Sequence, residues 1–127
     1  MASPQHAIIL AAGNGSRMGS LTADRPKALL EVAGRTLIDR QIDALRECGI
    51  RNVTVVNGYQ QQRLRDHLKD RATYIENTRY RETNSLYSLW LARTLLTHGS
   101  VVMNADILAS PQLLMRLISD RTWGPKR

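Results

Sequence analysis

The sequence predicts a three-layer α/β/α fold of the Rossmann-like kind, with a mainly parallel sheet. Two observations predict it. Short apolar runs rich in β-branched residues alternate with helical segments along the 127 residues, as in parallel α/β sheets. The first apolar run also ends at a pair of glycines. In parallel sheets, ligands bind at the edge that such strand ends form. The length allows one domain, so we assign residues 1–119 to it and expect 120–127 to be a flexible tail.

Each element follows from its local pattern. Strands are expected where apolar runs end at glycine or polar residues, at His6–Ala12, Val53–Asn57, Thr73–Glu76 and Val101–Asn104. Residues 28–32 read as a short extended piece followed by a turn. Helices are expected over residues 36–48, 60–68, 85–96 and 111–119. The first helix has an apolar face formed by Leu37, Ile38, Ile42 and Leu45.

Composition limits the classes of function. The net charge is +7, but the arginines are spread along the chain without interleaved aromatics, so we expect no nucleic-acid partner. No apolar run is long enough for a membrane span, and the first one has no basic leader. The single cysteine, Cys48, excludes an internal disulfide and is read as a small core residue. We therefore expect a cytoplasmic protein. The three histidines lack metal-ligand spacing.

The most informative segment is the turn after the first strand. It begins at Gly13 and Gly15 and is followed by Arg17 and, after a loop, by Lys27. Backbone N–H groups that converge in a glycine-rich turn bind anions, above all phosphate. The turn is neither a dinucleotide fingerprint, because Met18 replaces the third glycine, nor a P-loop. The alternative is an ordinary turn whose glycines only supply a positive φ.

Parallel strands would bring distant polar residues to one rim. Gly13, Asn57 and Asp106 each follow a predicted strand. Right-handed crossovers place the carboxyl ends of such strands on the same side of the sheet. We therefore treat the three positions as parts of one site.

Taken together, three motifs resemble one family. They are Gly13-x-Gly15-Ser16-Arg17, Arg25-Pro26-Lys27 and Leu29-x-x-Val32-x-Gly34-Arg35-x-Leu37-Ile38. They look like the signature of the nucleotidyltransferases that make nucleotide-diphospho-sugars and CDP-alcohols, and the resemblance extends through Asn104-Ala105-Asp106. It implies a GT-A-like version of the Rossmann-like fold. It also implies transfer of a nucleoside monophosphate from a nucleoside triphosphate to a phosphorylated acceptor, with release of pyrophosphate.

The resemblance also implies roles for individual residues. Arg17 and Lys27 would be catalytic, Arg17 gripping the β- and γ-phosphates and Lys27 bridging the α-phosphate and the acceptor phosphate. Asp106 would bind the catalytic Mg²⁺, although strand-end aspartates also serve as turn or capping residues. The nucleotide would be bound by residues of the first strand end, of the glycine-rich turn and of a later helix start: Leu10, Ala12, Gly13, Asn14, Gly15, Ser16, Arg17, Asn84 and Ser85.

The stretch from Asn77 to Trp90 resembles the phosphocholine cytidylyltransferase branch of this family. There a similar Asn-Ser pair opens a helix near the nucleoside, so CTP is the favoured triphosphate. The same pattern is also that of a helix N-cap, and both readings can hold together. Tyr87 and Trp90 stand at helical spacing and are read as core residues rather than a ligand box.

Three functions remain open at this point. The leading one is the nucleotide-binding part of a cytidylyltransferase that acts on a phosphocholine-like acceptor or a sugar 1-phosphate. The second is a non-catalytic nucleotide-binding or regulatory module. The third, a metal-dependent glycosyltransferase, is disfavoured by Arg17 and by Pro26-Lys27. Because the family's members are about twice as long, the resemblance leaves three interpretations of the chain open: a truncated form, a natural fragment or a pseudo-enzyme. We expect it to self-associate through the strand at 101–104 and to show little or no transfer alone.

Overall fold

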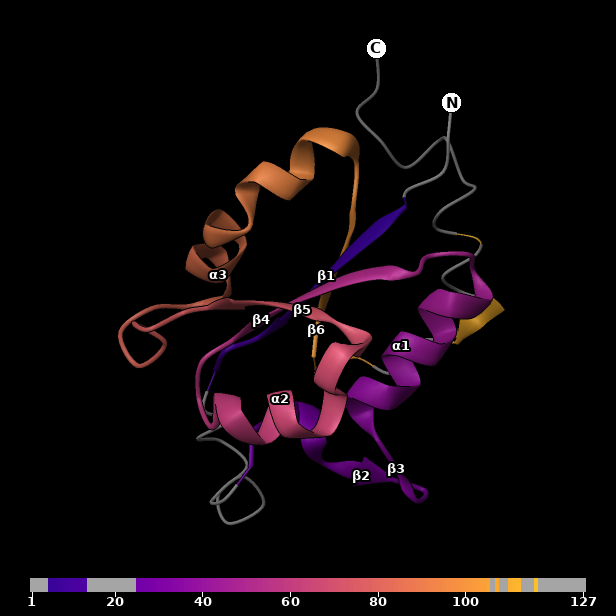
Figure 1. Ribbon diagram of the computed structural model, residues 1–127, viewed down its shortest axis with the longest axis horizontal. Helices are drawn as coiled ribbons and strands as arrows, with labels where there is room; N and C mark the ends of the chain where they lie inside the picture. The colour runs from indigo at the N-terminus through magenta and orange to yellow at the C-terminus, as the bar shows by residue number, and fades with distance from the viewer. Residues whose placement is uncertain (1–4, 14–24, 106, 108–109, 113–115, 117–127) are drawn as a thin grey trace.

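The computed structural model describes residues 5–13, 25–105, 107, 110–112 and 116. Its central feature is a four-stranded sheet in the order β5–β4–β1–β6, with all neighbouring strands parallel (Figure 1). The strands are β1 His6–Ala11, β4 Asn52–Asn57, β5 Thr73–Glu76 and β6 Val101–Asn104. The predicted strands are confirmed, with ends that differ by one residue at most.

Helices cover both faces of the sheet, which confirms the three-layer prediction. Helices α1 (Leu37–Glu47) and α2 (Gln61–Leu68) lie on one face. Helix α3 (Ser85–Leu91) and the 3-10 helix η4 (Arg93–His98) lie on the other (Figure 1). The chain runs outward from β1 to β4 and β5 and then returns to pair β6 with the other side of β1. The winding therefore reverses between β1 and β6, and such a reversal opens a crevice at the carboxyl ends of the strands.

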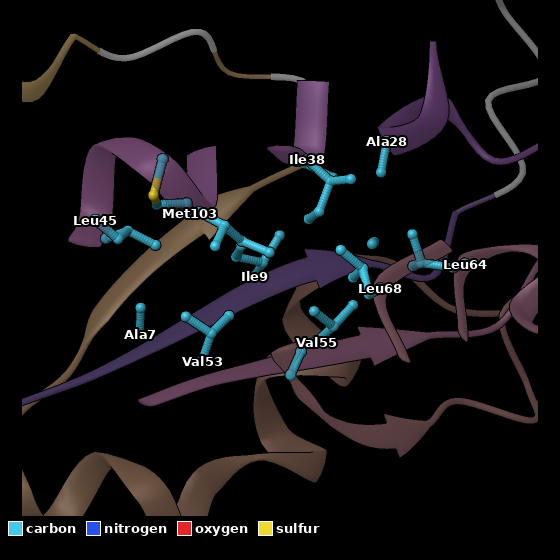
Figure 2. Close-up of a cluster of buried hydrophobic side chains, with 14 of the residues drawn as sticks. Ala7, Ile9, Ala28, Ile38, Leu45, Val53, Val55, Leu64, Leu68 and Met103 are labelled. Atoms are coloured by element: carbon cyan, nitrogen blue, oxygen red, sulfur yellow. The ribbon is translucent and has the colours of Figure 1, made fainter. Parts of the chain in front are cut away.

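The larger core lies between the sheet and the α1–α2 layer. Figure 2 shows Ile38 and Leu45 of α1 and Leu64 and Leu68 of α2 pointing toward the side chains of β1, β4 and β6. These side chains are almost fully buried. Burying a Leu or Ile side chain stabilises a fold by about 1.5–3 kcal/mol, so this layer holds α1 and α2 in place. A smaller cluster around Ile8 and Val56 joins the opposite face to α3 and η4.

The helix expected over residues 85–96 is shorter than predicted. It ends at Leu91, Ala92 forms its C-cap, and the backbone continues as η4. The interpretation of Trp90 as a core residue is wrong, since its side chain is 51% exposed, and that of Leu86 is 73% exposed. The physical reason is that α3 approaches the sheet through the small residues Ser88 and Ala92, which are both buried.

The extended piece expected at residues 28–32 is only partly correct. Residues Lys27–Leu29 form a 3-10 turn (η2), and the strands β2 (Glu31–Val32) and β3 (Arg35–Thr36) form a separate antiparallel hairpin. Its turn has positive φ at Ala33 and Gly34. Thr36 then caps α1 by accepting a hydrogen bond from the Asp39 N–H at 3.1 Å. The helix predicted at 111–119 and the tail at 120–127 fall largely or wholly outside the described residues.

In the part of the chain that the structure describes, no helix has the length and apolarity needed to cross a membrane.

Strand β6 forms one edge of the described sheet, and Val102 on it is 39% exposed. Exposed apolar edge strands pair with other chains, so we expect the protein to self-associate through β6. Val102→Lys should reduce the mass measured by light scattering, because a lysine on an edge strand opposes pairing. Leu86→Lys adds the same charge on α3 and should leave association unchanged. A monomeric wild-type chain, or an equal effect of both variants, would contradict edge pairing.

Candidate functional site

A pocket of about 240 Å³ opens at the carboxyl ends of β1 and β6, where the winding of the sheet reverses. Four segments line it, through Leu10, Ala11, Gly13, Lys27, Ala28, Ser85, Asn104 and Ala105. No acidic side chain is among these described lining residues, whereas Lys27 contributes a positive charge. The volume is below the roughly 300 Å³ of pockets that enclose a drug-sized ligand. The described residues therefore form a small pocket whose one charged lining residue is Lys27.

Hydrogen bonds hold the strand ends beside the pocket in place. The N–H of Ala105 donates to the carbonyl of Leu10 at 3.0 Å and so extends the β1–β6 pairing beyond β6 itself. On the other side of β1, the N–H of Tyr59 donates to the carbonyl of Ala12 at 3.1 Å. These bonds hold the backbone at the carboxyl end of β1 from both sides. The exposed Gly13 that follows begins the glycine-rich turn, whose later residues lie outside the described ones.

Lys27 is held by the short turn η2. Pro26 has an extended backbone, and its carbonyl accepts a hydrogen bond from the N–H of Leu29 at 2.9 Å. The Lys27 carbonyl accepts from the N–H of Leu30 at 3.0 Å. Ala28 is 1% exposed and packs into the main core, which anchors the turn against α1 and the sheet. The backbone of Lys27 is therefore fixed at the pocket, which this residue lines.

Ser85 reaches the pocket because it is the first residue of α3. Asn84 is the N-cap of this helix, and its side-chain oxygen accepts hydrogen bonds from the N–H groups of Leu86 and Tyr87. The N-cap interpretation is thus confirmed. The oxygen of Asn84 is engaged in capping, and this residue does not line the pocket, whereas Ser85 does.

A buried asparagine connects the start of α3 to the sheet. The side-chain amide nitrogen of Asn77 donates to the hydroxyls of Thr83 and Ser88, each at 3.1 Å, and its side-chain oxygen accepts from the N–H of Arg79. The Asn77 backbone N–H donates to the carbonyl of Asn57 at 2.7 Å. The loop that leads to Ser85 therefore starts from the carboxyl ends of β4 and β5.

Of the predicted site residues, the structure brings Leu10, Gly13, Lys27 and Ser85 together in one pocket. Ala12 is buried beside them without lining it. Asn57 lies at the same rim, opposite Ala11 in the β1–β4 register, but its buried side chain does not line the pocket either. The remaining predicted residues lie outside the described part of the chain, namely Asn14, Gly15, Ser16, Arg17 and Asp106.

Gln41 was not predicted from the sequence as a residue of the site. Its side chain is completely buried on the α1 face that packs against the sheet. Its amide nitrogen donates to the carbonyls of Asn104 and Ile107, at 2.8 and 2.7 Å. The available signal was a polar residue on an apolar helix face, one turn from Ile38 and from Leu45.

Two other kinds of site find no support in the described residues. They contain no group of three or more His, Cys, Asp or Glu side chains that could hold a metal ion by itself.

The cysteine is not placed as a nucleophile. Cys48 packs against the core and donates to the carbonyl of Pro111 at 3.4 Å. Burial, and secondly the charge of Glu47, raises the pKa of its thiol. A thiol with a raised pKa is a poor nucleophile, so Cys48 serves packing.

The chain is similar to a known family of proteins over most of its length. The MobA-like NTP transferase domain family matches it over residues 7–125. A CTP:phosphoglutamine cytidylyltransferase of Campylobacter jejuni is 33% identical, over 93% of this chain and 53% of that protein. A choline-phosphate cytidylyltransferase of Streptococcus pneumoniae is 39% identical, over 79% of this chain and 44% of that protein. The chain thus spans about half the length of the curated relatives it matches.

Solved structures agree with the fold. The CTP:phosphocholine cytidylyltransferase from Streptococcus pneumoniae superposes with a TM-score of 0.76 and 34% identity, over 88% of this chain and 51% of that one. The inositol-1-phosphate CTP transferase from T. maritima gives a TM-score of 0.75 and 25% identity, over 94% and 50%. The mainly parallel, Rossmann-like nucleotidyltransferase fold predicted from the sequence is therefore confirmed.

Two glycines at the rim should respond differently to alanine. A Cβ on Gly58 would lie 2.9 Å from both the carbonyl oxygen of Asn77 and the Cβ of Tyr80. Gly58→Ala should therefore destabilise the protein by about 1–3 kcal/mol, measured by urea unfolding. Gly13 has no described atom within 4 Å of such a Cβ, and its φ is not positive.

Gly13→Ala is the matched control, because it adds the same methyl group in open space beside the pocket. We expect near-normal stability and weaker binding of phosphate-containing ligands, since the methyl group occupies the approach to the backbone. A stable Gly58→Ala variant would contradict the close packing of the 77–80 segment on β4.

Proposed function

Since the chain belongs to the MobA-like NTP transferase domain family, we propose that it is the nucleotide-binding part of a cytidylyltransferase. Such an enzyme transfers CMP from CTP to a phosphorylated small-molecule acceptor and releases pyrophosphate. The observation that carries the proposal is the pocket that joins Gly13, Lys27, Ser85 and Asn104 at the reversal of the sheet. Phosphocholine-like compounds are the favoured acceptors, because phosphocholine and related phosphorylated compounds are named for several relatives.

The proposed reaction requires positive charge beside the phosphates, and Lys27 lines the pocket. An oxygen of the acceptor phosphate attacks the α-phosphorus, and the bond from that phosphorus to the bridging oxygen breaks. The electron pair leaves with pyrophosphate. Both reactants are anionic and repel each other until cations neutralise them. We assign Lys27 to the α-phosphate and the acceptor phosphate, and Arg17 to the leaving β- and γ-phosphates. The attacking phosphate is already ionised, so no general base is needed.

We assign the nucleoside part of CTP to the start of α3. Ser85 lines the pocket and offers a hydroxyl that can donate to or accept from the ribose or the base. Asn84 retains its amide nitrogen as a donor, because only its oxygen is used in capping. The backbone at Gly13 begins the turn assigned to the phosphates, together with Asn14, Gly15 and Ser16.

We assign Mg²⁺ to this site as an ion shared with the phosphates of the substrate. The described residues offer no self-sufficient cage, and Mg²⁺ is usually bound by one or two carboxylates together with phosphates and waters. Asp106, which follows the pocket-lining Ala105 in the sequence, would supply the carboxylate. When bound, the ion neutralises phosphate charge.

A non-catalytic nucleotide-binding module is the second candidate function, because the chain spans about half the length of its relatives.

Binding of CTP tests the proposal directly. CTP with Mg²⁺ should raise the thermal midpoint of this chain, because a ligand that binds only the native state stabilises it. At a hundredfold excess over the dissociation constant the gain is about 2.7 kcal/mol. Differential scanning fluorimetry with each of the four triphosphates measures it and ranks the bases. No shift with any triphosphate at millimolar concentration would overturn the assignment.

Substitution of the charged residues separates binding from catalysis. In a form of the protein that turns over, Lys27→Ala should lower kcat by about a hundredfold to a thousandfold and weaken CTP binding far less. Asp106→Ala should remove the dependence on Mg²⁺ along with most activity. Arg63→Ala, an exposed arginine on α2, is the control and should change neither. Near-normal turnover of Lys27→Ala, in a steady-state pyrophosphate-release assay, would show that the lysine is misassigned.

A further inference from the structure

Apolar packing holds the end of α3 rather than its start. Leu91, the last residue of the helix, packs against the smaller core cluster together with Leu95 of η4. Leu86 and Trp90 are exposed. All seven residues of the helix are described, and Ser88 alone among them is buried. The first turn of α3 therefore depends on a polar contact for its place on the sheet.

That contact is a buried hydrogen bond between Asn77 and Ser88. The side-chain amide nitrogen of Asn77 donates to the hydroxyl of Ser88 at 3.1 Å, and the two residues are only 1% and 3% exposed. The same nitrogen also donates to the hydroxyl of Thr83, and the side-chain oxygen accepts from the N–H of Arg79. Because both donors and the oxygen of Asn77 are engaged inside the protein, it acts on a ligand through other residues.

The backbone of Asn77 is itself fixed to the sheet. Asn77 directly follows β5, and its N–H donates to the carbonyl of Asn57, the last residue of β4, at 2.7 Å. Its carbonyl oxygen lies so close to Gly58 that a Cβ on this glycine would be 2.9 Å away. The hydrogen bond to Ser88 therefore fixes α3 relative to the carboxyl ends of β4 and β5.

Ser88 and the pocket-lining Ser85 belong to the same face of α3. They are three residues apart, and residues at this spacing are neighbours on a helix surface, about 4.5 Å apart along the axis. A rotation or shift of the helix at Ser88 would therefore move Ser85 by a similar amount. Ser85 is the residue of α3 that lines the pocket.

We propose that Asn77 is a positioning residue, which through Ser88 sets the hydroxyl of Ser85 for the nucleoside part of the substrate. The proposal rests on the proposed function for the identity of the ligand. The phosphates are assigned to a different part of the pocket, at Gly13 and Lys27. Loss of the bond between Asn77 and Ser88 should therefore weaken the binding of the nucleoside and leave that of the phosphates unchanged.

Ser88→Ala removes the hydroxyl that Asn77 binds and keeps the helix, because alanine favours helical backbone. Calorimetric titration should show CTP affinity falling by about threefold to tenfold, the value of one hydrogen bond. The affinity for inorganic tripolyphosphate, which has no nucleoside, should be unchanged. Ser100→Ala is the matched control. It removes a hydroxyl that donates to the carbonyl of Leu95 at 2.9 Å, away from the pocket, and should keep both affinities.

A double variant tests whether the effect passes through Ser85. Ser85→Ala should itself lower CTP affinity by about threefold to tenfold. Addition of Ser88→Ala to that variant should lower it no further, because the hydroxyl that Ser88 helps to place is already gone. Losses that multiply in the double variant, or an equal loss of CTP and tripolyphosphate affinity in Ser88→Ala, would overturn the proposal.

Hydrogen exchange provides the readout that does not need a nucleotide. In Ser88→Ala, the amides of Leu86 and Tyr87 should exchange faster, whereas that of Val55 in the central strand β4 should keep its protection. Unchanged exchange at Leu86 and Tyr87 would overturn the proposal. If the wild-type chain binds no CTP, the proposed function and the nucleoside role are overturned. Faster exchange at the two amides would then still leave Asn77 as the residue that holds α3.

Discussion

The parallel pairing of β1 with β6 is the constraint on which the rest of the site depends. It joins the first and the last of the described strands, and it places the ends of both beside each other at the point where the winding reverses. The hydrogen bond from Ala105 to Leu10 continues this pairing to the pocket. Without it, the residues that follow β1 and those that follow β6 would have no shared surface. The pocket would then lose two of its four sides.

The other two sides of the pocket are held to the β1–β6 pair by different kinds of contact. Lys27 depends on the burial of Ala28, so an apolar contact fixes the backbone from which the charge extends. Ser85 depends on polar contacts, since Asn84 caps α3 and Asn77 fastens the preceding loop to the ends of β4 and β5. A residue with a positive charge and one with a hydroxyl thus line the same pocket. This separation suits a ligand with phosphates at one end and a nucleoside at the other.

Much of the fold was predictable, because strand and helix signals act locally. Apolar runs such as 53–57 and 101–104, bounded by polar residues or glycine, determine the strands. Because the strands are parallel, their carboxyl ends then lie at the same edge of the sheet. The exposure of Trp90 was not predictable, because the face that α3 turns to the sheet depends on how closely Ser88 and Ala92 approach it. The contacts of Gln41 were not predictable either. Its partners are 63 and 66 residues away, and sequence spacing carries no sign of them. The parts of the site assigned to Arg17 and Asp106 rest on the sequence motifs alone.

Four segments that are distant in the sequence line one pocket, and we propose that this pocket binds a nucleotide. Titration of the isotopically labelled chain with CTP and Mg²⁺, followed by NMR of the backbone amides, tests this claim most directly. Shifts are expected together at Gly13, Ala28, Ser85 and Ala105, with a single dissociation constant, and none at Thr73 or Arg35, which do not line the pocket. Shifts confined to one segment, or different constants for different segments, would contradict a shared site.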